Sequence, residues 1–343
     1  RILFTMYRNK IFHNGKFTKV ATITGDTMKV HPHGDGPIYD SLVKLAQPWN
    51  NLLCTIDGKG NFGTMTGSPA AAPRYIEAKL SYYAYKCFFE EFDENIVDMK
   101  PNYSNDFMEP EYLPSKYPNI LINGSFGIGY GISCSIPTYN FVEVCELTKK
   151  LMDDPDYEDI TLLPDSPTGA MIIDEGQFKK ISEEGKGSFK MRGKIDIDFE
   201  NNILTIKSVP FQSNANDIKR NIIQLFKENK LQGLKRVNNK SGSRTGLHME
   251  FHLKKEIDPV AVKHIIYKKT KMEDSYSVRY KFIDDLKYHD CNIRSILLEW
   301  IEYRRETKRK IFNQKLTEAK ERQHILEILL FILNKDNAEK TLS

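Results

Sequence analysis

The sequence predicts an α+β multidomain protein, and three stretches support this fold class. Near the N-terminus, two segments with helical spacing flank a tight turn. Between residues 165 and 255, short apolar runs alternate as strands do and surround one amphipathic helix. Residues 293–333 consist of strong helix formers without Gly or Pro. A chain of 343 residues accommodates two or three structural units.

The first stretch has the outline of a helix-turn-helix. Residues 19–29 form one candidate helix, and Ile38, Leu42 and Leu45 recur at helical spacing in the other. Between them, residues 30–37 hold two glycines and two prolines, which force a turn. The second helix of such a pair can enter a DNA groove, although many other helical pairs share this spacing.

His31 and His33 lie in this turn. A histidine there can act as a general base, bind a phosphate or cap the turn. No third side chain with metal-ligand spacing accompanies them, so the sequence predicts no metal site here.

Arg74 and Tyr75 follow three alanines and a proline. A tyrosine hydroxyl can attack a phosphodiester and hold the broken end as a phosphotyrosine, but its pKa of about 10 makes it a weak nucleophile at neutral pH. A neighbouring guanidinium stabilises the phenolate and the charge that builds on the phosphate oxygens. The pair alone is weak support for catalysis, because the chain has 17 tyrosines.

Two glycine-rich stretches follow. Residues 57–63 resemble a phosphate-binding loop only loosely, and we interpret them as a wing or hairpin turn. Residues 119–122 predict an apolar strand, followed by a glycine-dense loop over residues 124–131. Ile128 lies between glycines of that loop, where it is either buried or presented to a partner as a wedge between base steps.

The stretch from residue 165 to 255 predicts an α+β module without an evident chemical constellation. We expect strands at 170–173, 194–199, 203–206 and 247–253, a hairpin turn at 201–202 and a helix over 216–231. A basic loop, formed by Lys235, Arg236, Lys240 and Arg244, either contacts phosphate or is only solvated. The helix over 293–333 would span about 60 Å, and helices of this length normally pack against another helix or subunit.

The net charge of +4 conceals three blocks of unequal sign. Basic side chains outnumber acidic ones by 11 to 5 in residues 1–87 and by 35 to 25 in residues 166–343, whereas residues 88–165 hold 4 basic and 16 acidic side chains. A basic first block that also contains Arg74 and Tyr75 suits a polyanionic partner, although charge blocks are commonly solvated surfaces.

Cysteine usage and hydropathy indicate a reduced, intracellular compartment. The five cysteines are odd in number and show no metal-binding spacing. No apolar run reaches the roughly 18 residues of a membrane helix, and the start of the chain has no signal-peptide pattern. Because the chain begins without Met, we expect it to be part of a longer protein.

Several motifs occur together in one order. They are His31-Pro32-His33-Gly34-Asp35, Asp57-Gly58-Lys59-Gly60-Asn61-Phe62-Gly63, Ala70-Ala71-Ala72-Pro73-Arg74-Tyr75, Leu121-Ile122-Asn123-Gly124-Ser125, Gly127-Ile128, Ile136-Pro137, Pro167-Thr168-Gly169, Gly185-Lys186-Gly187-Ser188 and Glu302-Tyr303-Arg304-Arg305. With these motifs the chain resembles, nearly end to end, the breakage-reunion (A) subunit of type IIA DNA topoisomerases. This family includes the A subunits of bacterial gyrase and topoisomerase IV and their phage counterparts.

The resemblance implies a catalytic role for five residues. Tyr75 matches the nucleophile that forms a 5′-phosphotyrosine link, and Arg74 matches the transition-state arginine beside it. His33 matches an active-site histidine, whereas His31 belongs to the bacterial form of that motif. Arg1 matches a basic residue near the scissile phosphate.

The resemblance also implies DNA contacts and a domain layout. Ile128 matches the isoleucine that intercalates and bends the cleaved duplex, and the other expected DNA-binding residues are Lys19, Lys29, Lys44 and Ser125. The implied layout is a winged-helix (helix-turn-helix) DNA-cleavage domain over residues 1–115 and an α/β tower domain over residues 116–288. Residues 289–343 would then be the first part of a coiled-coil helix leading to an exit gate.

Some family features are absent from the sequence or altered in it. The acidic Glu-Gly-Asp-Ser-Ala motif of the family's metal-binding domain does not occur. We therefore expect Mg²⁺ and ATP to be bound mainly by a gyrase-B-like subunit or domain. Gly36 occupies a position that is usually serine in gyrase, near Asp40, where quinolones are anchored. His31-Pro32-His33 is bacterial in form, whereas Gly129-Tyr130-Gly131 is closer to eukaryotic or phage forms.

Two hypotheses of different class follow. The first is the DNA-cleavage and religation core of an ATP-dependent type IIA topoisomerase, a cytoplasmic enzyme of a bacterial or phage-infected cell. Its partners would be double-stranded DNA, a second copy of this chain and the gyrase-B-like subunit, with no membrane. The alternative is a non-catalytic winged-helix module that binds and bends DNA. A helix-turn-helix repressor would leave the tower-like stretch and the long helix unexplained.

Overall fold

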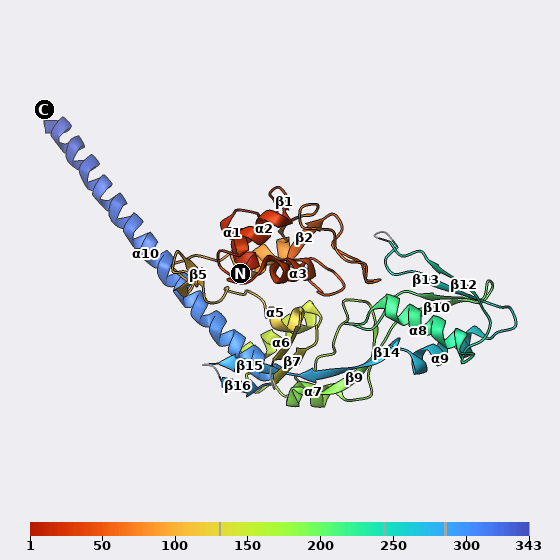
Figure 1. Cartoon of the computed structure of the whole chain (residues 1–343). Coiled ribbons are helices and arrows are strands. Elements are labelled where there is room, and N and C mark those ends of the chain that lie inside the picture. Colours follow the sequence, from red (N-terminus) through yellow and green to blue (C-terminus); the bar gives the residue numbers. More distant parts are fainter. Residues whose placement is uncertain (130–131, 243–244, 285–286, 343) are drawn as a thin grey trace.

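The computed structural model describes residues 1–129, 132–242, 245–284 and 287–342. It is a mixed α/β structure with several antiparallel sheets, and one long helix projects from it (Figure 1). The predicted combination of helices and sheets is therefore confirmed. Among the described residues, no helix combines the length and apolar character needed to span a bilayer.

The first part of the chain surrounds a three-stranded sheet with the strand order β1-β3-β2. Its elements are α1 (Ile2–Arg8), β1 (Thr18–Lys19), α2 (Val20–Thr27), α3 (Asp35–Leu45), β2 (Ile56–Lys59), β3 (Glu77–Leu80), α4 (Tyr82–Ala84) and the π-helical turn η1 (Tyr85–Phe89). Buried side chains of α1, α2, α3 and the sheet share one hydrophobic core, which includes Phe4, Ile23, Leu42, Ile56 and Ile76.

The predicted pair of helices is confirmed as α2 and α3. The glycine-rich stretch at 57–63 is only partly loop, because its first residues belong to β2, which pairs with β3. The Cβ of any residue replacing Gly58 would lie 2.6 Å from the Phe62 ring, so this strand and the following loop pack closely. A short hairpin of β4 (Met99–Pro101) and β5 (Met108–Pro110) follows, and Figure 1 shows β5 beside the long helix.

The middle of the chain is organised around a five-stranded sheet of order β6-β7-β14-β9-β8. Its elements are α5 (Asn119–Ile122), β6 (Ser125–Gly129), β7 (Ile132–Ile136), α6 (Phe141–Asp153), β8 (Met171–Ile173), α7 (Phe178–Glu184), β9 (Lys186–Arg192) and β14 (Glu273–Arg279). The chain leaves this sheet after β9 and returns through β14, which pairs with β9 along its whole length.

Two predictions for this region are wrong. Residues 119–122, predicted as a strand, form the short helix α5, and Leu121 and Ile122 are both buried. The glycine-dense segment predicted as a loop contains β6, which pairs with β7. Gly124 precedes this strand, and Tyr130 and Gly131 lie outside the described part of the chain.

Between β9 and β14 lies a four-stranded sheet of order β10-β11-β13-β12. Its elements are β10 (Ile195–Asp198), β11 (Ile203–Ile206), α8 (Ala215–Lys227), β12 (Leu234–Asn239), β13 (Met249–Leu253) and α9 (Pro259–Lys269). The strands expected here and the hairpin turn at Asn201-Asn202 are confirmed. The expected helix is also present, although it ends at Lys227 and not at residue 231. The basic loop was predicted wrongly, because Lys235 and Arg236 belong to β12. Arg244 lies outside the described residues.

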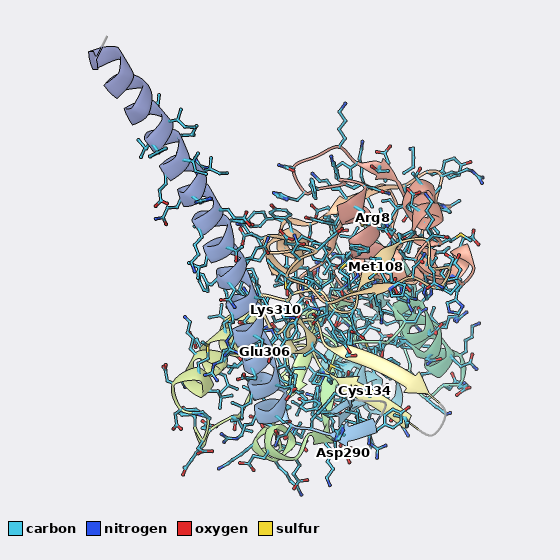
Figure 2. The ribbon with its side chains drawn as sticks, turned by 90° about the vertical axis from the view of Figure 1, so that its left-hand side faces the viewer. Arg8, Met108, Cys134, Asp290, Glu306 and Lys310 are labelled. Carbon is cyan, nitrogen blue, oxygen red and sulfur yellow. The ribbon has the colours of Figure 1, made fainter. Side chains whose placement is uncertain are left out.

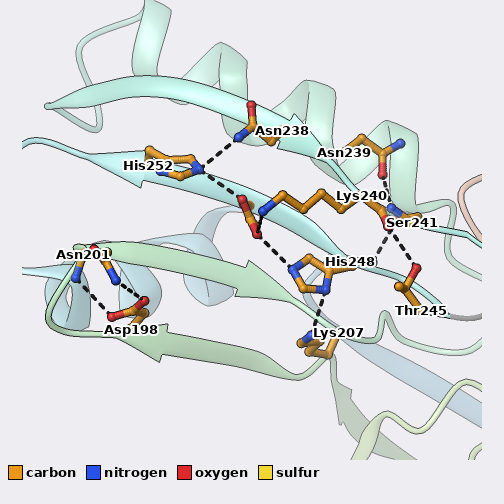
Figure 3. A network of polar contacts seen from close by, with 11 residues as sticks. Asp198, Asn201, Lys207, Asn238, Asn239, Lys240, Ser241, Thr245, His248 and His252 are labelled. Carbon is orange, nitrogen blue, oxygen red and sulfur yellow. Dashed lines mark hydrogen bonds and ion pairs between the residues drawn. The ribbon is translucent and has the colours of Figure 1, made fainter.

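One face of the four-stranded sheet is apolar and the other is polar. Met249, Phe251 and Leu253 of β13 are buried against α8 and α9, which Figure 1 shows lying along this sheet. On the opposite face, Lys240, His248 and His252 lie close together (Figure 3), and all three contact Glu250. The Lys240 ammonium lies 2.7 Å from one Glu250 oxygen, and the imidazoles of His248 and His252 each lie 3.1 Å from the carboxylate. The hydrogen bond from Lys240 is the main reason why the pKa of Glu250 falls from 4.5 to about 2.

This pKa gives a pH-dependent prediction for stability. Because the folded-state pKa lies below the ordinary value, the stabilisation by ionised Glu250 is complete above pH 4.5 and is lost as the pH falls towards about 2. We expect Glu250→Gln to lower the free energy of unfolding by about 1.5–3 kcal/mol at pH 7. In thermal melts, the difference in stability between this variant and the wild type should shrink as the pH falls from 4.5 to about 2. Glu256→Gln, at an exposed carboxylate, is the control; equal pH dependence in both variants would contradict this prediction.

The C-terminal part comprises a two-stranded ribbon and the long helix. The ribbon is formed by β15 (Lys281–Asp284) and β16 (Lys287–Asp290), and α10 runs over Ile293–Leu342. The predicted long helix is thus confirmed. Ile293, Leu297 and Ile301 anchor its first turns in the core of the five-stranded sheet.

The acidic block of the sequence lies against the first half of α10. Glu91 accepts hydrogen bonds from Arg304 and from Lys308, the latter at 2.7 Å, and the Lys310 ammonium lies 2.9 Å from Asp98. Figure 2 shows Lys310 where the helix meets the body of the protein, whereas the far half of α10 extends away from it. On that far half, apolar side chains from Ile325 to Leu333 are exposed.

Candidate active site

Tyr75 lies on a turn that is fixed to the beginning of α2. The backbone N–H of Ala21 donates to the Pro73 carbonyl at 3.2 Å, and that of Val20 donates to the Ile76 carbonyl at 3.0 Å. These bonds satisfy N–H groups that a helix start otherwise leaves without partners. Because Ile76 is buried in the core next to the turn, Tyr75 points outwards, and 64% of it is exposed.

Arg74 lies directly over Tyr75. Its guanidinium carbon is 4.6 Å from the centre of the tyrosine ring, a distance typical of a cation–π contact. Among the described residues, neither the Tyr75 hydroxyl nor the Arg74 guanidinium makes a hydrogen bond with another side chain or with the backbone. Both groups are therefore available to a ligand, and the guanidinium offers up to five N–H donors beside a potential nucleophile.

Arg1, His31 and His33 form a second group, which we call the Arg1 cluster. The Arg1 Nη1 lies 2.9 Å from Nδ1 of His31, and the rings of the two histidines meet edge to face with centres 4.5 Å apart. Burial lowers the pKa of His31, and the neighbouring His33 and Arg1 charges lower it further. The second donor edge of Arg1 binds Glu109 at 2.8 Å.

Helix α2 separates Tyr75 from the Arg1 cluster. The tyrosine turn is bonded to the first residues of α2, and His31 follows its last turn, where the His31 N–H donates to the Thr27 carbonyl at 3.0 Å. A helix of eight residues spans about 12 Å. The structure thus brings Arg1, His31 and His33 together, brings Arg74 and Tyr75 together, and holds the two groups at opposite ends of one short helix.

Helix α3 borders both groups. The Tyr39 hydroxyl donates to the Ala71 carbonyl, just before the tyrosine turn. At the other group, a cavity of about 420 Å³ is lined by Arg1 and His31 together with Ile38 and Ser41 of α3. The second helix of the predicted helix-turn-helix therefore contacts the segment before the tyrosine turn and lines a cavity together with Arg1 and His31.

The three lysines expected to contact DNA differ in their surroundings. Lys19 and Lys59 lie 2.9 and 3.1 Å from the two oxygens of Glu77, and hydrogen bonds from these lysines lower the pKa of Glu77. Lys29 pairs with Asp26 at 2.7 Å, whereas Lys44 is exposed in the last turn of α3. All three side chains remain largely open to solvent.

Ile128 and Ser125 lie on β6, which belongs to a different sheet from β3, the strand that follows the tyrosine turn. Ile128 is 76% exposed, so it is presented on the surface of the hairpin formed by β6 and β7. Phe126 is also 59% exposed, and both side chains line a cavity of about 710 Å³ together with Lys186 and Arg279. The sequence analysis missed Phe126, although its alternation with Ile128 would have revealed it once a strand was assigned.

Glu109 is the other residue that the sequence analysis missed. Its only signal in the sequence was its membership of the acidic block, and nothing local pointed to a contact with Arg1.

No group of three or more His, Cys, Asp or Glu side chains within the described ranges is arranged to hold a metal ion.

Comparison with known proteins gives one consistent result. The family model for the A subunit of DNA gyrase and topoisomerase IV matches residues 1–342. The gyrase A subunit of Granulibacter bethesdensis is 35% identical over 335 residues, which cover 95% of this chain and 35% of that protein. The gyrase A subunit of Thermotoga maritima is 32% identical over 339 residues, covering 96% of this chain and 42% of that protein. That of Streptococcus pneumoniae is 33% identical over 345 residues, covering 97% and 42% respectively. The chain thus spans less than half the length of these relatives.

Proposed function

Because the chain belongs to the family of DNA gyrase and topoisomerase IV A subunits, we propose that it is the DNA-cleavage and religation part of an ATP-dependent type IIA topoisomerase. The observation that supports this best is the exposed Tyr75 beside the Arg74 guanidinium, which makes no hydrogen bond within the described residues, on a turn fixed to α2. Two copies would each cut one strand of a duplex, hold the ends covalently while a second duplex passes, and reseal the break.

The cleavage step is an exchange of phosphodiester bonds. The Tyr75 hydroxyl gives up its proton and its oxygen forms a bond to phosphorus, while the bond from phosphorus to the 3′ oxygen breaks and that oxygen takes up a proton. The 5′ end stays on the tyrosine, so resealing needs no new source of energy. The Arg74 guanidinium would stabilise both the phenolate and the charge on the phosphate oxygens.

The Arg1 cluster would bind a backbone phosphate near the scissile one. A guanidinium has donors only, so Nδ1 of His31 must accept the hydrogen bond from Arg1, and the ring proton resides on Nε2. Nε2–H is then a donor for a phosphate oxygen, as is His33, which is exposed next to it. Since α2 separates this cluster from Tyr75, the two would engage different parts of the DNA backbone.

The proposed fold assignments follow the same family. Residues 1–115 would be the winged-helix domain, 116–288 the tower, and 289–343 the start of the coiled coil towards the exit gate. Ile128 would insert between base steps and bend the duplex, and Ser125 and the three lysines would contact its backbone. The exposed apolar end of α10 supports packing against a further helix or subunit.

A homodimer and a gyrase-B-like partner would complete the enzyme. The partner would bind Mg²⁺ through carboxylates and would hydrolyse ATP during strand passage. When bound there, Mg²⁺ would offset phosphate charge. Since Lys and Arg contacts to phosphate displace counterions, DNA binding should weaken steeply with salt.

A plasmid cleavage assay tests the proposal. The full-length protein and its partner are incubated with supercoiled plasmid and Mg²⁺, and the reaction is stopped with detergent and protease. Linear DNA with protein-blocked 5′ ends is the expected product. DNA bending without any linear product, with a partner shown to be folded and bound, would favour the non-catalytic DNA-bending module instead.

Gly36 leads to a prediction about fluoroquinolones. It lies exposed in the first turn of α3, near Asp40, and has no hydroxyl to anchor the drug's metal–water bridge. A Cβ at this position would meet nothing within 4 Å, so serine fits without rearrangement. We expect weak drug-stabilised cleavage in the wild type and at least about a tenfold gain in drug sensitivity in Gly36→Ser, which corresponds to about 1.4 kcal/mol of drug binding. Strong trapping by low drug concentrations in both proteins would contradict this.

A further inference from the structure

We propose that Glu109 is a positioning residue of the cleavage site, which holds the Arg1 guanidinium in its contact with His31. This inference rests on the function proposed above. Glu109 comes from β5 and is only 3% exposed. Its Oε1 accepts a hydrogen bond from Arg1 Nη2 at 2.8 Å, while Arg1 Nη1 donates to His31 Nδ1 at 2.9 Å. One planar guanidinium thus bridges a buried carboxylate and an imidazole.

The bridge defines the hydrogen-bonding state of His31. Because arginine cannot accept a hydrogen bond, Nδ1 of His31 must be unprotonated where it meets Arg1. The orientation of the guanidinium fork is set by its other edge, which is bound to Glu109. Glu109 therefore acts on His31 through Arg1. Carboxylates that hydrogen-bond to a metal-ligating side chain orient that side chain in the same indirect way.

Burial makes this contact difficult to release. The second oxygen of Glu109, Oε2, has no hydrogen-bond partner among the described residues, so Arg1 is the cation that compensates this carboxylate. Lys100, opposite Glu109 in the hairpin, lies 3.8 Å from the exposed Glu111 instead. Moving Arg1 away would leave a buried charge uncompensated, which is strongly unfavourable. Yet Arg1 itself is 42% exposed, so its remaining donors can face a phosphate.

The hairpin that carries Glu109 is itself fixed to the site. The Asn102 side-chain amide donates to the Lys29 carbonyl at 3.0 Å, two residues before His31. The guanidinium of Arg8 lies 4.3 Å from the centre of the Phe107 ring, which ties the hairpin to α1, and Arg8 and Met108 are labelled at this junction in Figure 2. The hairpin thus contacts both α1, which directly follows Arg1, and the segment that leads to His31.

A double-mutant cycle in the full-length protein with its partner tests this role. We expect Glu109→Gln, which keeps the shape but removes the charge, to lower the rate of plasmid cleavage about 10- to 100-fold. In an Arg1→Gln background the same substitution should have almost no further effect, because its influence passes through Arg1. Glu111→Gln, at an exposed carboxylate on the same segment, is the matched control and should retain wild-type cleavage.

A second measurement does not depend on cleavage. In protein labelled with ¹⁵N-histidine, the His31 Nδ1 signal of Glu109→Gln should move from its wild-type position towards its position in Arg1→Gln. The positioning role would be overturned if the effects of the two substitutions on the cleavage rate were fully additive, or if the Nδ1 signal did not shift. Absence of covalent product from the wild-type complex would instead overturn the proposed function. If Glu109→Gln does not fold, Glu109→Asp, which shortens the side chain by one methylene, takes its place in both measurements.

Discussion

Replacing Tyr75 with phenylalanine is expected to reduce covalent protein–DNA complexes by at least about a thousandfold, because it removes the only atom that attacks the phosphate in the proposed reaction. The hydroxyl makes no hydrogen bond within the described structure, and the side chain is exposed. We therefore expect the melting temperature and the affinity for duplex DNA to stay close to wild type. The yield of detergent-trapped linear plasmid measures the covalent complexes, and filter binding of the same DNA measures the affinity.

Tyr82→Phe is the matched control for this experiment. Tyr82 is exposed to a similar degree, 61% against 64% for Tyr75, and follows it by one strand. The Tyr82→Phe protein should cleave plasmid DNA as the wild type does. Covalent complex formation that survives in Tyr75→Phe would show that another group is the nucleophile. If both variants lost covalent complexes to the same extent, the cause would be a general effect on DNA binding.

The largest effect on stability is expected for Gly185→Ala. Gly185 ends α7 with a φ of +68°, and its carbonyl accepts a hydrogen bond from the Tyr280 N–H at 2.7 Å. A Cβ at this position would lie 1.7 Å from the backbone oxygen of Cys291. Both neighbours are buried in the core of the five-stranded sheet, so the backbone itself must move. We expect the free energy of unfolding to fall by at least about 3 kcal/mol, which would be measured as a lower melting temperature.

Gly176→Ala separates the two causes of this loss. Gly176 has a similar backbone conformation, with a φ of +83°, but a Cβ there would meet nothing within 4 Å. Its substitution should cost only about 1 kcal/mol, the strain of the left-handed conformation alone. Equal destabilisation by the two substitutions would show that the contact with Cys291 does not matter.

The sequence by itself determined the features that depend on neighbouring residues. The helix that begins at Ile293 and the hairpin turn at Asn201-Asn202 follow from helix propensity and turn chemistry, both of which are local. The pairing of Arg74 with Tyr75 is also local, since adjacent residues on a tight turn cannot separate far. Motif order was sufficient for the family, which the comparison then showed.

Tertiary structure decided the features that depend on distant partners. Leu121 and Ile122 are consecutive apolar residues, and so short a run fits a buried helix as well as a strand; packing in the core selected the helix. Residues 125–129 are rich in glycine, yet they form a strand because β7 supplies hydrogen-bond partners. Glu109 meets Arg1 across 108 positions of the sequence, and only the packing of the hairpin of β4 and β5 against α1 and the segment after α2 brings them together. Periodicity reports which side of an element is apolar, but it carries no information about which charged groups meet once that side is buried.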